Sequence, residues 1–243
     1  MVLELMKAHA SVRDYKDQPL TKEQVVELVE AAQMAATSHF VQAYSIVWVT
    51  DQDMRKEIGQ LSSNVNQLET AGAVFLLCAD YRRLEEASKM HGEPVVYDLA
   101  EQLIVAVTDV GLLAQNLALA AESKGYGICY IGGVRSNLEK ISNLAKLPKG
   151  VFPVYGLTVG VPNEKNEVKP RLPVEAILHE NVYDAEKYAT LLPEYDETMK
   201  AYYARRSSNQ KSTTWTKQMA DFLKAPRRAE ITEFLKKQGY EMK

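Results

Sequence analysis

The sequence predicts a layered protein of the α/β or α+β class, in which helices pack against a β-sheet. Compact, β-rich apolar runs alternate with segments of helical periodicity along residues 1–162, and this alternation is typical of a sheet covered by helices. Hydrophobic residues make up 46% of the 243-residue chain and charged residues 25%, as in ordinary globular proteins. A chain of this length buries about 70–75% of its unfolded surface, so it can build a core without disulfide or metal staples.

The N-terminal region is predicted to be helical, with clear start signals. Residues 3–8 have the pattern of a short helix. Thr21 and Gln24 have the spacing of a capping box, and the helix after them carries an apolar stripe at spacings of three and four, formed by Val25, Leu28, Val29 and Ala32. Asp51 can cap another short helix, which runs to Ile58. These caps predict where the two later helices begin.

Four short apolar runs, rich in β-branched and aromatic residues, are predicted to be strands. They span residues 44–49, 73–79, 126–131 and 151–161. Residues 81–94 are polar and indicate an exposed loop or a short helix between two of these strands. Ser136 and Glu139 have the spacing of a second capping box, which predicts a helix between the last two strands.

A long helix is predicted over residues 97–124, ending at Gly125, a residue that suits a helix C-cap. The helix is nearly apolar all round from Leu103 to Ala121, so it is expected to be buried on most faces. About 28 residues of helix reach roughly 42 Å, which is longer than one small core requires. A helix shared by two subunits would explain both its length and its composition.

The composition changes after Pro162. Residues 163–183 are polar and contain prolines, and residues 184–243 look helical but carry few core-type stripes. We therefore predict one domain overall, with a core over residues 1–162 and a wrap-around extension over residues 163–243.

Charge and cysteine usage narrow the class of protein. The net charge of −3 gives no general attraction to nucleic acid or to an anionic membrane. Cys78 and Cys129 each lie in an apolar run and are expected to be inert core thiols of a reducing compartment. The N-terminus lacks a signal-peptide pattern, and the most apolar stretch, taken as residues 71–79, is shorter than the roughly 20 residues that span a bilayer. A cytoplasmic protein without membrane or nucleic-acid partners is expected.

Motifs that would supply a catalytic side chain or a metal are missing from the sequence. It contains no G-x-S-x-G, H-E-x-x-H, P-loop or complete G-x-G-x-x-G pattern, and Gly125-Tyr126-Gly127 precedes a strand, which is the wrong context for a dinucleotide-binding turn. The four histidines have no metal-ligand spacing. We therefore expect no metal site and no catalytic side chain, with any difficult chemistry carried by a cofactor.

Three separated segments have the chemistry to hold an anionic ligand: residues 9–13, 130–133 and 169–173. The first combines an imidazole, a hydroxyl and a guanidinium, whose fork suits phosphate. The paired glycines of the second let backbone approach a flat ligand, and the prolines of the third present two cations at a fixed spacing. Taken alone, such segments are more often a solvated helix end, a plain turn and a basic loop, respectively, than parts of a ligand site.

Together the three segments resemble the nitroreductase superfamily. The pattern is His9-x-Ser11-x-Arg13, then Tyr130-Ile131-Gly132-Gly133 and Lys169-Pro170-Arg171-Leu172-Pro173, and the similarity extends to Thr37-Ser38-His39-Phe40-Val41-Gln42, Cys78-Ala79-Asp80, Ala114-Gln115-Asn116, Tyr202-Tyr203 and Ser208-Asn209. The NADPH-dependent branch, with its oxygen-insensitive nitroreductases and flavin reductases, is the most similar. The resemblance implies an α+β fold with a central, mostly antiparallel sheet flanked by helices, in an intertwined homodimer with a C-terminal extension.

The resemblance also implies a non-covalent FMN at the dimer interface. Its expected contacts are His9, Ala10, Ser11, Arg13, Thr37, Ser38, Gln42, Asn64, Tyr130, Ile131, Gly132, Gly133, Lys169 and Arg171. Ala10 stands where relatives carry an arginine-like residue, so one contact is expected to be lost. Relatives have a glycine-rich segment where this chain has residues 63–67, which leaves open whether Asn64, Asn66 or Gln67 contacts the flavin. His39 and Phe40 are expected to line the substrate face.

Residues 200–228 contain many Lys and Arg but only one acid, Asp221. The resemblance implies that Arg206, with Arg205 nearby and Arg228 as a weaker partner, grips the 2′-phosphate of NADPH. The implied activity is ping-pong reduction of small-molecule electron acceptors: nitroaromatics, quinones, azo compounds or free flavin. Two alternatives stay open: a flavin-binding redox sensor with a basic interaction tail, and a member of the superfamily with other flavin chemistry.

Overall fold

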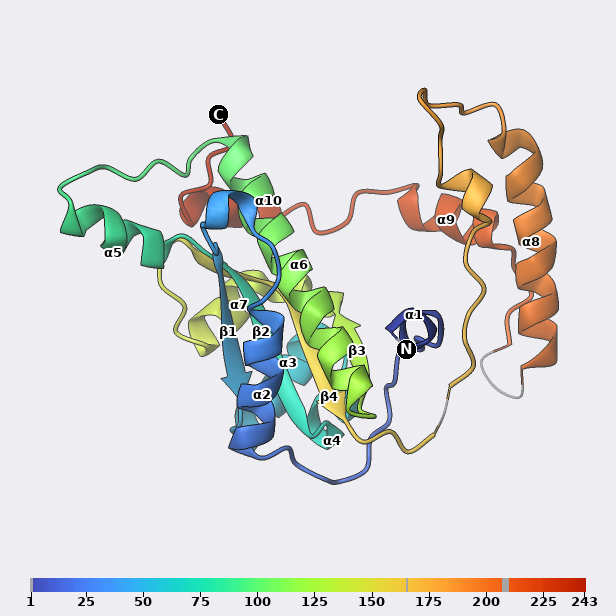
Figure 1. The fold of residues 1–243 in the computed structure, drawn as a ribbon, viewed down its shortest axis with the longest axis horizontal. Coiled ribbons are helices and arrows are strands. Elements are labelled where there is room, and N and C mark those ends of the chain that lie inside the picture. The colour runs from blue at the N-terminus through green and yellow to red at the C-terminus, as the bar shows by residue number, and fades with distance from the viewer. Residues whose placement is uncertain (1, 165, 207–209) are drawn as a thin grey trace. The chain divides into compact units, whose positions relative to one another are not determined.

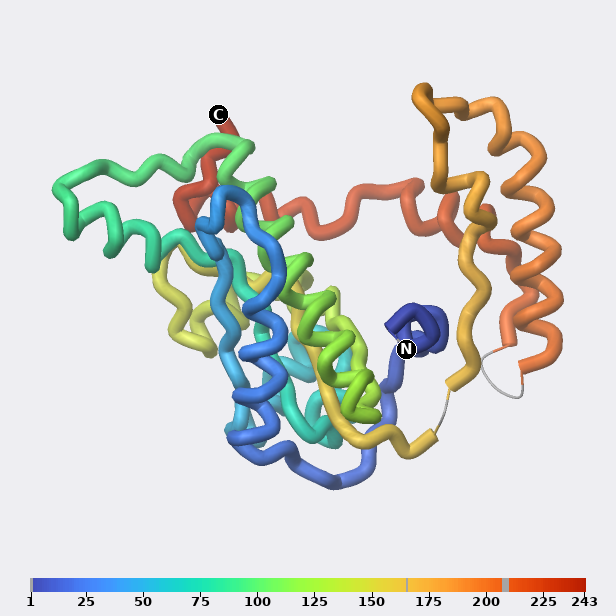
Figure 2. The backbone as a smooth tube through the Cα atoms, viewed as in Figure 1, coloured from blue at the N-terminus to red at the C-terminus, as the bar shows by residue number. Residues whose placement is uncertain are grey.

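The computed structural model describes residues 2–164, 166–206 and 210–243, so Ser208 and Asn209 of the family-like pattern lie outside the described residues. The chain divides into two compact units, Met1–Asn166 with Arg228–Lys243, and Glu167–Arg227. The first unit contains the β-sheet (Figure 1). The chain leaves this unit after Asn166 and returns to it at Arg228. Figure 2 traces the backbone in colours that run from the N-terminus to the C-terminus.

The sheet consists of β1 (Tyr44–Val49), β2 (Ala73–Asp80), β3 (Gly127–Ile131) and β4 (Val151–Gly160). Its order is β1-β2-β4-β3, and each neighbouring pair is antiparallel. The four predicted strands are thus confirmed to within one residue at each end. The antiparallel pairing confirms the α+β class and makes the α/β alternative wrong.

Helices cover both faces of the sheet. On one face of the sheet lie α2 and α6 (Figure 1), whose buried side chains form a cluster with Phe75, Leu77 and Leu157. On the other face α3, α4 and α7 pack against Leu76 and Cys78. The helices of the first unit are α1 (Val2–Lys7), α2 (Lys22–Ala32), α3 (Gln52–Ser62), α4 (Val65–Thr70), α5 (Arg82–Met90), α6 (Ala100–Ser123), α7 (Leu138–Leu144) and α10 (Ile231–Lys237), with 3₁₀ turns η1 (Ser38–Phe40) and η2 (Gly132–Asn137).

Two of the three predicted caps are confirmed. Thr21 and Gln24 form the reciprocal hydrogen bonds of a capping box at the start of α2, and the Asp51 side chain accepts from the Met54 amide at the start of α3. The predicted box of Ser136 with Glu139 is wrong, because η2 delays the start of α7 to Leu138 and leaves no side-chain cap there.

Helix α6 begins three residues later than predicted and ends as predicted. Gly125 has a φ of +83°, and the amides of Gly125 and Tyr126 donate back to the carbonyls of Glu122 and Ala121, which is a Schellman motif. The expected burial on most faces is wrong within one chain. Ile104 is 60% exposed and Leu112 is 44% exposed, so one apolar stripe of α6 faces outward.

Among the described residues, α6 is the one helix long and apolar enough to cross a membrane by length and composition. The sequence interpretation that residues 71–79 form the most apolar stretch overlooked it. Core helices of globular domains have the same composition, and Ala106, Val110 and Leu113 of α6 are fully buried in the cluster that lies against the sheet.

The second unit has a small aromatic core. It contains η3 (Val174–Ala176), α8 (Tyr188–Arg205) and α9 (Trp215–Leu223). Four buried side chains of α8 form the core, packed against Leu172 and Trp215: Tyr195, Met199, Tyr202 and Tyr203. Asp196 joins the two helices, because its carboxylate accepts hydrogen bonds from the amide and the hydroxyl of Thr216.

Candidate functional site

The segment 9–13 lies along β3. The amide of Val12 donates to the carbonyl of Ile128 over 2.9 Å, and His9 Nδ1 lies 2.5 Å from Glu122 Oε1 at the end of α6. The side chains of Ser11 and Arg13 make no hydrogen bond or ion pair with another described residue. Arg13 is exposed. An anchored backbone that offers an uncommitted hydroxyl and guanidinium has the chemistry of a phosphate site.

The end of β3 brings two predicted segments together. A Cβ on Gly133 would lie 2.2 Å from the Ser62 carbonyl oxygen and 3.0 Å from Asn64 Nδ2, so the turn after α3 packs directly on this backbone. Gly133 is therefore required by the chain's own packing, a reason different from the flat ligand assumed for it. Gly132 is less crowded, since its nearest neighbour would be the Arg135 guanidinium at 3.3 Å.

The positions of Asn64, Asn66 and Gln67 separate the three candidates for a flavin contact. Asn64 donates to the Ser62 carbonyl over 2.6 Å and lies beside Gly133. Gln67 is 5% exposed and its amide donates to Thr158 Oγ1 inside the core. Asn66 is exposed on α4. Only Asn64 therefore lies against residues 130–133.

Tyr130 and Ile131 complete the strand end. Tyr130 is half-buried, and its ring meets the edge of the Tyr155 ring at a centroid distance of 5.7 Å. Burial, followed by the proximity of Tyr155 and Glu122, raises the pKa of the Tyr130 hydroxyl. The phenol is therefore neutral at ordinary pH and can serve as a hydrogen-bond donor, not as a base.

Residues 37–42 form a partly exposed loop before β1, which includes the turn η1 and has an unusual backbone. His39, Phe40 and Gln42 have φ values of 46°, 59° and 52°, in the left-handed region that non-glycine residues rarely adopt. The Phe40 ring is 79% exposed, and the Thr37 hydroxyl is buried without a hydrogen-bond partner. An exposed aromatic ring and an unpaired buried hydroxyl on one strained loop are features of a ligand-contacting segment.

Cations gather on two buried tyrosines in the second unit. Lys169 and Lys211 lie 5.7 and 5.6 Å from the centre of the Tyr203 ring. Arg205 and Arg206 each lie 5.6 Å from the centre of the Tyr202 ring. Among the described residues none of these four cations forms an ion pair with a carboxylate, so we call them the cation cluster. Arg171 lies in the same unit, on the segment that the Tyr195 hydroxyl holds through the Pro170 carbonyl.

Lys211 is the member of the cation cluster that sequence reasoning did not assign. Its ammonium also donates to Gln218 Oε1 over 2.8 Å. The sequence pointed to Lys211 only through the excess of basic residues over acids in residues 200–228. An excess of positive charge does not distinguish a solvated helix face from cations ordered on aromatic rings.

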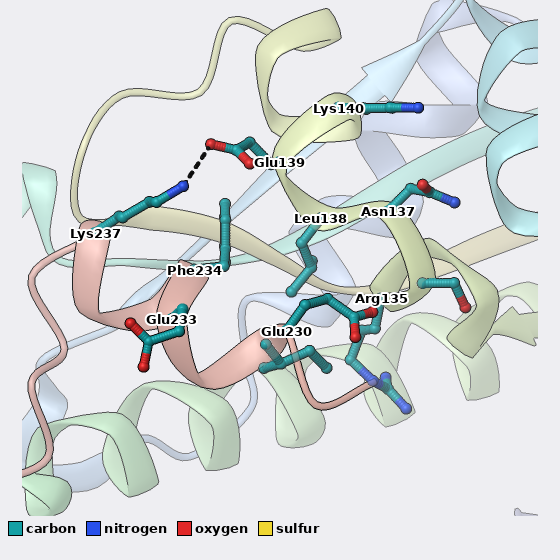
Figure 3. A pocket seen from close by; sticks show the side chains of 11 residues that line it. Arg135, Asn137, Leu138, Glu139, Lys140, Glu230, Glu233, Phe234 and Lys237 are labelled. Atoms are coloured by element: carbon teal, nitrogen blue, oxygen red, sulfur yellow. Dashed lines mark hydrogen bonds and ion pairs between the residues drawn. The ribbon is translucent and has the colours of Figure 1, made fainter. Parts of the chain in front are cut away.

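Arg228 belongs to the first unit, unlike Arg205 and Arg206. Its Nε donates to the Ser136 hydroxyl over 3.1 Å. Nearby, a pocket of about 260 Å³ lies between α7 and α10 (Figure 3). Its walls carry both signs of charge and include an ion pair of Lys237 with Glu139. None of the predicted FMN contacts lines this pocket.

Comparison with known proteins identifies the family. Residues 6–161 match the nitroreductase family, and residues 169–243 match the C-terminal domain of that family. The chain belongs to the nitroreductase family. The resemblance seen in the sequence is thereby confirmed over nearly its whole length.

Among relatives of this nitroreductase-family chain is a protein named Cr(VI) reductase from Pseudomonas sp. (strain G-1), 57% identical over 243 residues that cover 100% of both chains. A protein named FMN reductase (NADPH) from Bacillus subtilis (strain 168) is 37% identical and covers 98% of this chain and 97% of its own. The structure of NfrA1 from B. megaterium matches with a TM-score of 0.95 at 43% identity, covering 99% of both chains. The similarity therefore includes both compact units.

Proposed function

We propose that this nitroreductase-family protein is an FMN-dependent NADPH oxidoreductase that reduces small-molecule acceptors by two electrons. The observation that carries the proposal is the hydrogen bond from Val12 to Ile128. It holds the segment with Ser11 and Arg13 beside β3, the strand that ends with Tyr130 and Ile131. Phosphate-type donors and a ring-lining segment thus belong to one local structure, in a chain whose full-length relative is named FMN reductase (NADPH).

The residues present fit FMN by the chemistry of their free groups. We assign the uncommitted Ser11 hydroxyl and Arg13 guanidinium to the phosphate and ribityl chain, with His9 and Ala10 beside them and Lys169 and Arg171 as further phosphate ligands. We assign Asn64 and Tyr130, Ile131, Gly132 and Gly133 to the ring. When bound, FMN would supply the redox chemistry, taking a hydride from NADPH and delivering two electrons to the acceptor.

The cation cluster supports NADPH as the electron donor. A phosphate monoester dianion is bound most strongly by several cations held in fixed positions. Besides Lys169, which is assigned to FMN, the cluster holds Lys211, Arg205 and Arg206 on the rings of Tyr202 and Tyr203. We assign Arg206 and Arg205 to the 2′-phosphate, with Arg228 as a weaker partner. These contacts would discriminate NADPH from NADH, which lacks that phosphate.

A homodimer is proposed from the outward apolar stripe of α6 and the exposed apolar side chains of α1. Large exposed apolar surfaces on a globular chain usually mark an interface. The stripe and its neighbours are Val2, Leu3, Met6, Ile104 and Leu112, each more than 40% exposed. In this dimer Thr37, Ser38 and Gln42 would approach the FMN of the partner subunit. The proposed location is the cytoplasm, and residues 163–243 are proposed to act as an extension that completes the FMN and NADPH sites.

The proposed acceptors are nitroaromatics, quinones, azo compounds and free flavin, with His39 and Phe40 on the acceptor side. The Phe40 ring is 79% exposed, so flat acceptors of different sizes can stack on it. Chromate is added as an acceptor, because the 57% identical relative is named Cr(VI) reductase.

The test is anaerobic spectroscopy of the purified protein followed by steady-state kinetics. A flavin spectrum that NADPH bleaches and that each proposed acceptor restores would support the function. A colourless protein that takes up no added FMN would overturn it. Comparing initial rates with NADPH and NADH across the acceptors, chromate included, then ranks donors and acceptors.

A further inference from the structure

The loop of residues 37–42 needs an external constraint. Three of its six residues, His39, Phe40 and Gln42, have positive φ values, and such conformations persist only where the surrounding structure enforces them. Two charged side chains from different helices supply contacts to this loop.

Asp109 contacts the loop from the buried side. Its side chain is 0% exposed in the middle of α6. Oδ1 accepts the Ser38 amide over 3.0 Å and Oδ2 accepts the Ala43 amide over 3.1 Å. The carboxylate thus binds one amide on each side of the strained residues, and a buried carboxylate is tolerated only when it has such partners.

Arg83 contacts the last residue of the loop and the start of β1 from the solvent side. Its guanidinium donates to the carbonyls of Gln42 and Tyr44 over 3.3 and 3.2 Å and to the Ser45 hydroxyl over 2.9 Å. The Asp109 carboxylate accepts hydrogen bonds from backbone amides, and the Arg83 guanidinium donates to backbone carbonyls. The two charged groups therefore bind complementary backbone groups. Arg83 is itself 3.8 Å from Asp80, which orients it at the end of β2.

We infer that Asp109 is a positioning residue for the flavin and acceptor face, with Arg83 as its helper. It fixes the conformation of residues 37–42 and so the placement of Thr37, Ser38, His39 and Phe40. This inference rests on the proposed function, which assigns those side chains to FMN and acceptor. Neither charged group touches a ligand in this role; both act through the loop.

The test compares the full-length Asp109→Asn variant with the wild type. An asparagine side chain offers one acceptor oxygen, so it can satisfy only one of the two amides. Since hydrogen bonds to a charged group each contribute enough for roughly a tenfold change in an equilibrium, hydrogen exchange of the amides in residues 38–43 should accelerate by about tenfold. The acceptor KM and the FMN dissociation constant should rise by a similar factor, with a smaller change in kcat.

Two further variants separate positioning from simple destabilisation. Leu117→Ala removes a fully buried side chain from the same helix and should lower the melting temperature without changing loop exchange or acceptor KM. Arg83→Ala should act in the same direction as Asp109→Asn but more weakly, because Arg83 is 57% exposed, and it serves if Asp109→Asn does not fold.

The results that would overturn the positioning role differ from the result that would overturn the proposed function. Loop exchange and acceptor KM equal to wild type in the variants of Asp109 and Arg83 would overturn the positioning role, as would faster loop exchange with unchanged FMN affinity and KM. A wild-type protein that takes up no FMN would instead overturn the proposed function, and this result is seen before any variant is compared.

Discussion

The guanidinium of Arg206 lies 5.6 Å from the centre of the buried Tyr202 ring. Arg205 lies at the same distance from that ring, and Tyr203 beside it carries two lysines. A cation ordered on a rigid aromatic ring loses less conformational entropy when it binds a ligand than a freely rotating one. The arrangement therefore favours Arg206 as a ready-made ligand for a phosphate.

Arg206→Ala is expected to raise the KM for NADPH by roughly tenfold or more, since a charge-assisted hydrogen bond contributes about 1.5–3 kcal/mol. The KM for NADH should change little, because NADH has no 2′-phosphate to lose contact with. Steady-state kinetics with both donors measure the difference. The matched control is Arg227→Ala, which removes an exposed arginine stacked on Phe222 in the same unit. Equal increases in the KM for NADPH and for NADH would contradict the assignment of Arg206 to the 2′-phosphate.

Gly133→Ala is expected to destabilise the protein by about 1–3 kcal/mol, the usual cost of forcing extra atoms into a packed region. The new methyl group would lie 2.2 Å from the Ser62 carbonyl oxygen, and backbone cannot swing away as a side-chain tip can. Urea denaturation of the flavin-free protein measures the loss of unfolding free energy.

Gly132→Ala is the control for that variant. Its methyl group would meet the Arg135 guanidinium at 3.3 Å, the mobile end of a long side chain, so a loss of only a few tenths of a kcal/mol is expected for this mild contact. Equal losses in the two variants would show that the crowding at Ser62 does not decide the role of Gly133.

The sequence predicted the sheet closely because its strands are short, apolar and flanked by polar residues, as residues 44–49 illustrate. Thr21 and Asp51 were also predicted correctly as caps, because each accepts a hydrogen bond from an amide only three residues later. Ser136 and Glu139 have the same spacing, but the 3₁₀ turn η2 occupies that position. Spacing alone does not reveal that a preceding turn shifts the helix start.

The sequence predicted those parts of the candidate site that belong to a recognisable motif. It did not predict the parts whose role depends on contacts with residues far away in the chain. Gly133 was singled out by its sequence, yet its packing against Ser62 depends on a turn 71 residues earlier in the chain. Asp109 was missed, although a lone acid within an apolar helix signals a buried partner. The sequence predicts burial of α6 on most faces and offers a helix shared by two subunits as the explanation. Composition does not show which stripe the same chain leaves uncovered, and in the structure that stripe contains Ile104 and Leu112.

Ile104→Lys is expected to convert a dimer into monomers and to lower FMN affinity. Ile104 is 60% exposed on α6, and a buried, unpaired ammonium at an interface costs several kcal/mol. Light scattering coupled to size exclusion measures the mass, and flavin retention measures the second effect. Gln60→Lys places the same charge at an exposed polar residue of α3, a helix on the other face of the sheet from α6, and it should leave both unchanged. A wild-type protein that is monomeric in solution would overturn the proposed dimer interface.

Asp196 is expected to make the second unit sensitive to acid. Burial alone would raise the pKa of its carboxyl, but hydrogen bonds from Thr216, Thr214 and the Trp215 amide outweigh burial and hold the pKa below its usual range. A carboxyl with a depressed folded-state pKa contributes stability that is fully present above its unfolded pKa of about 4 and is lost as pH falls through the folded value.

Asp196→Asn should therefore lower the melting temperature at pH 7, and its difference from wild type should shrink as the pH falls below the unfolded pKa of about 4 toward the lower folded-state pKa of Asp196. Thermal unfolding followed by tryptophan fluorescence is a suitable measurement, because Trp215 packs on Tyr195 next to Asp196. Glu197→Gln is the control, since Glu197 is 72% exposed and its ion pair with Lys200 at 3.5 Å is a surface contact of small energy. A melting-temperature difference between Asp196→Asn and wild type that stays constant with pH would show that the Asp196 charge does not stabilise the junction of α8 and α9.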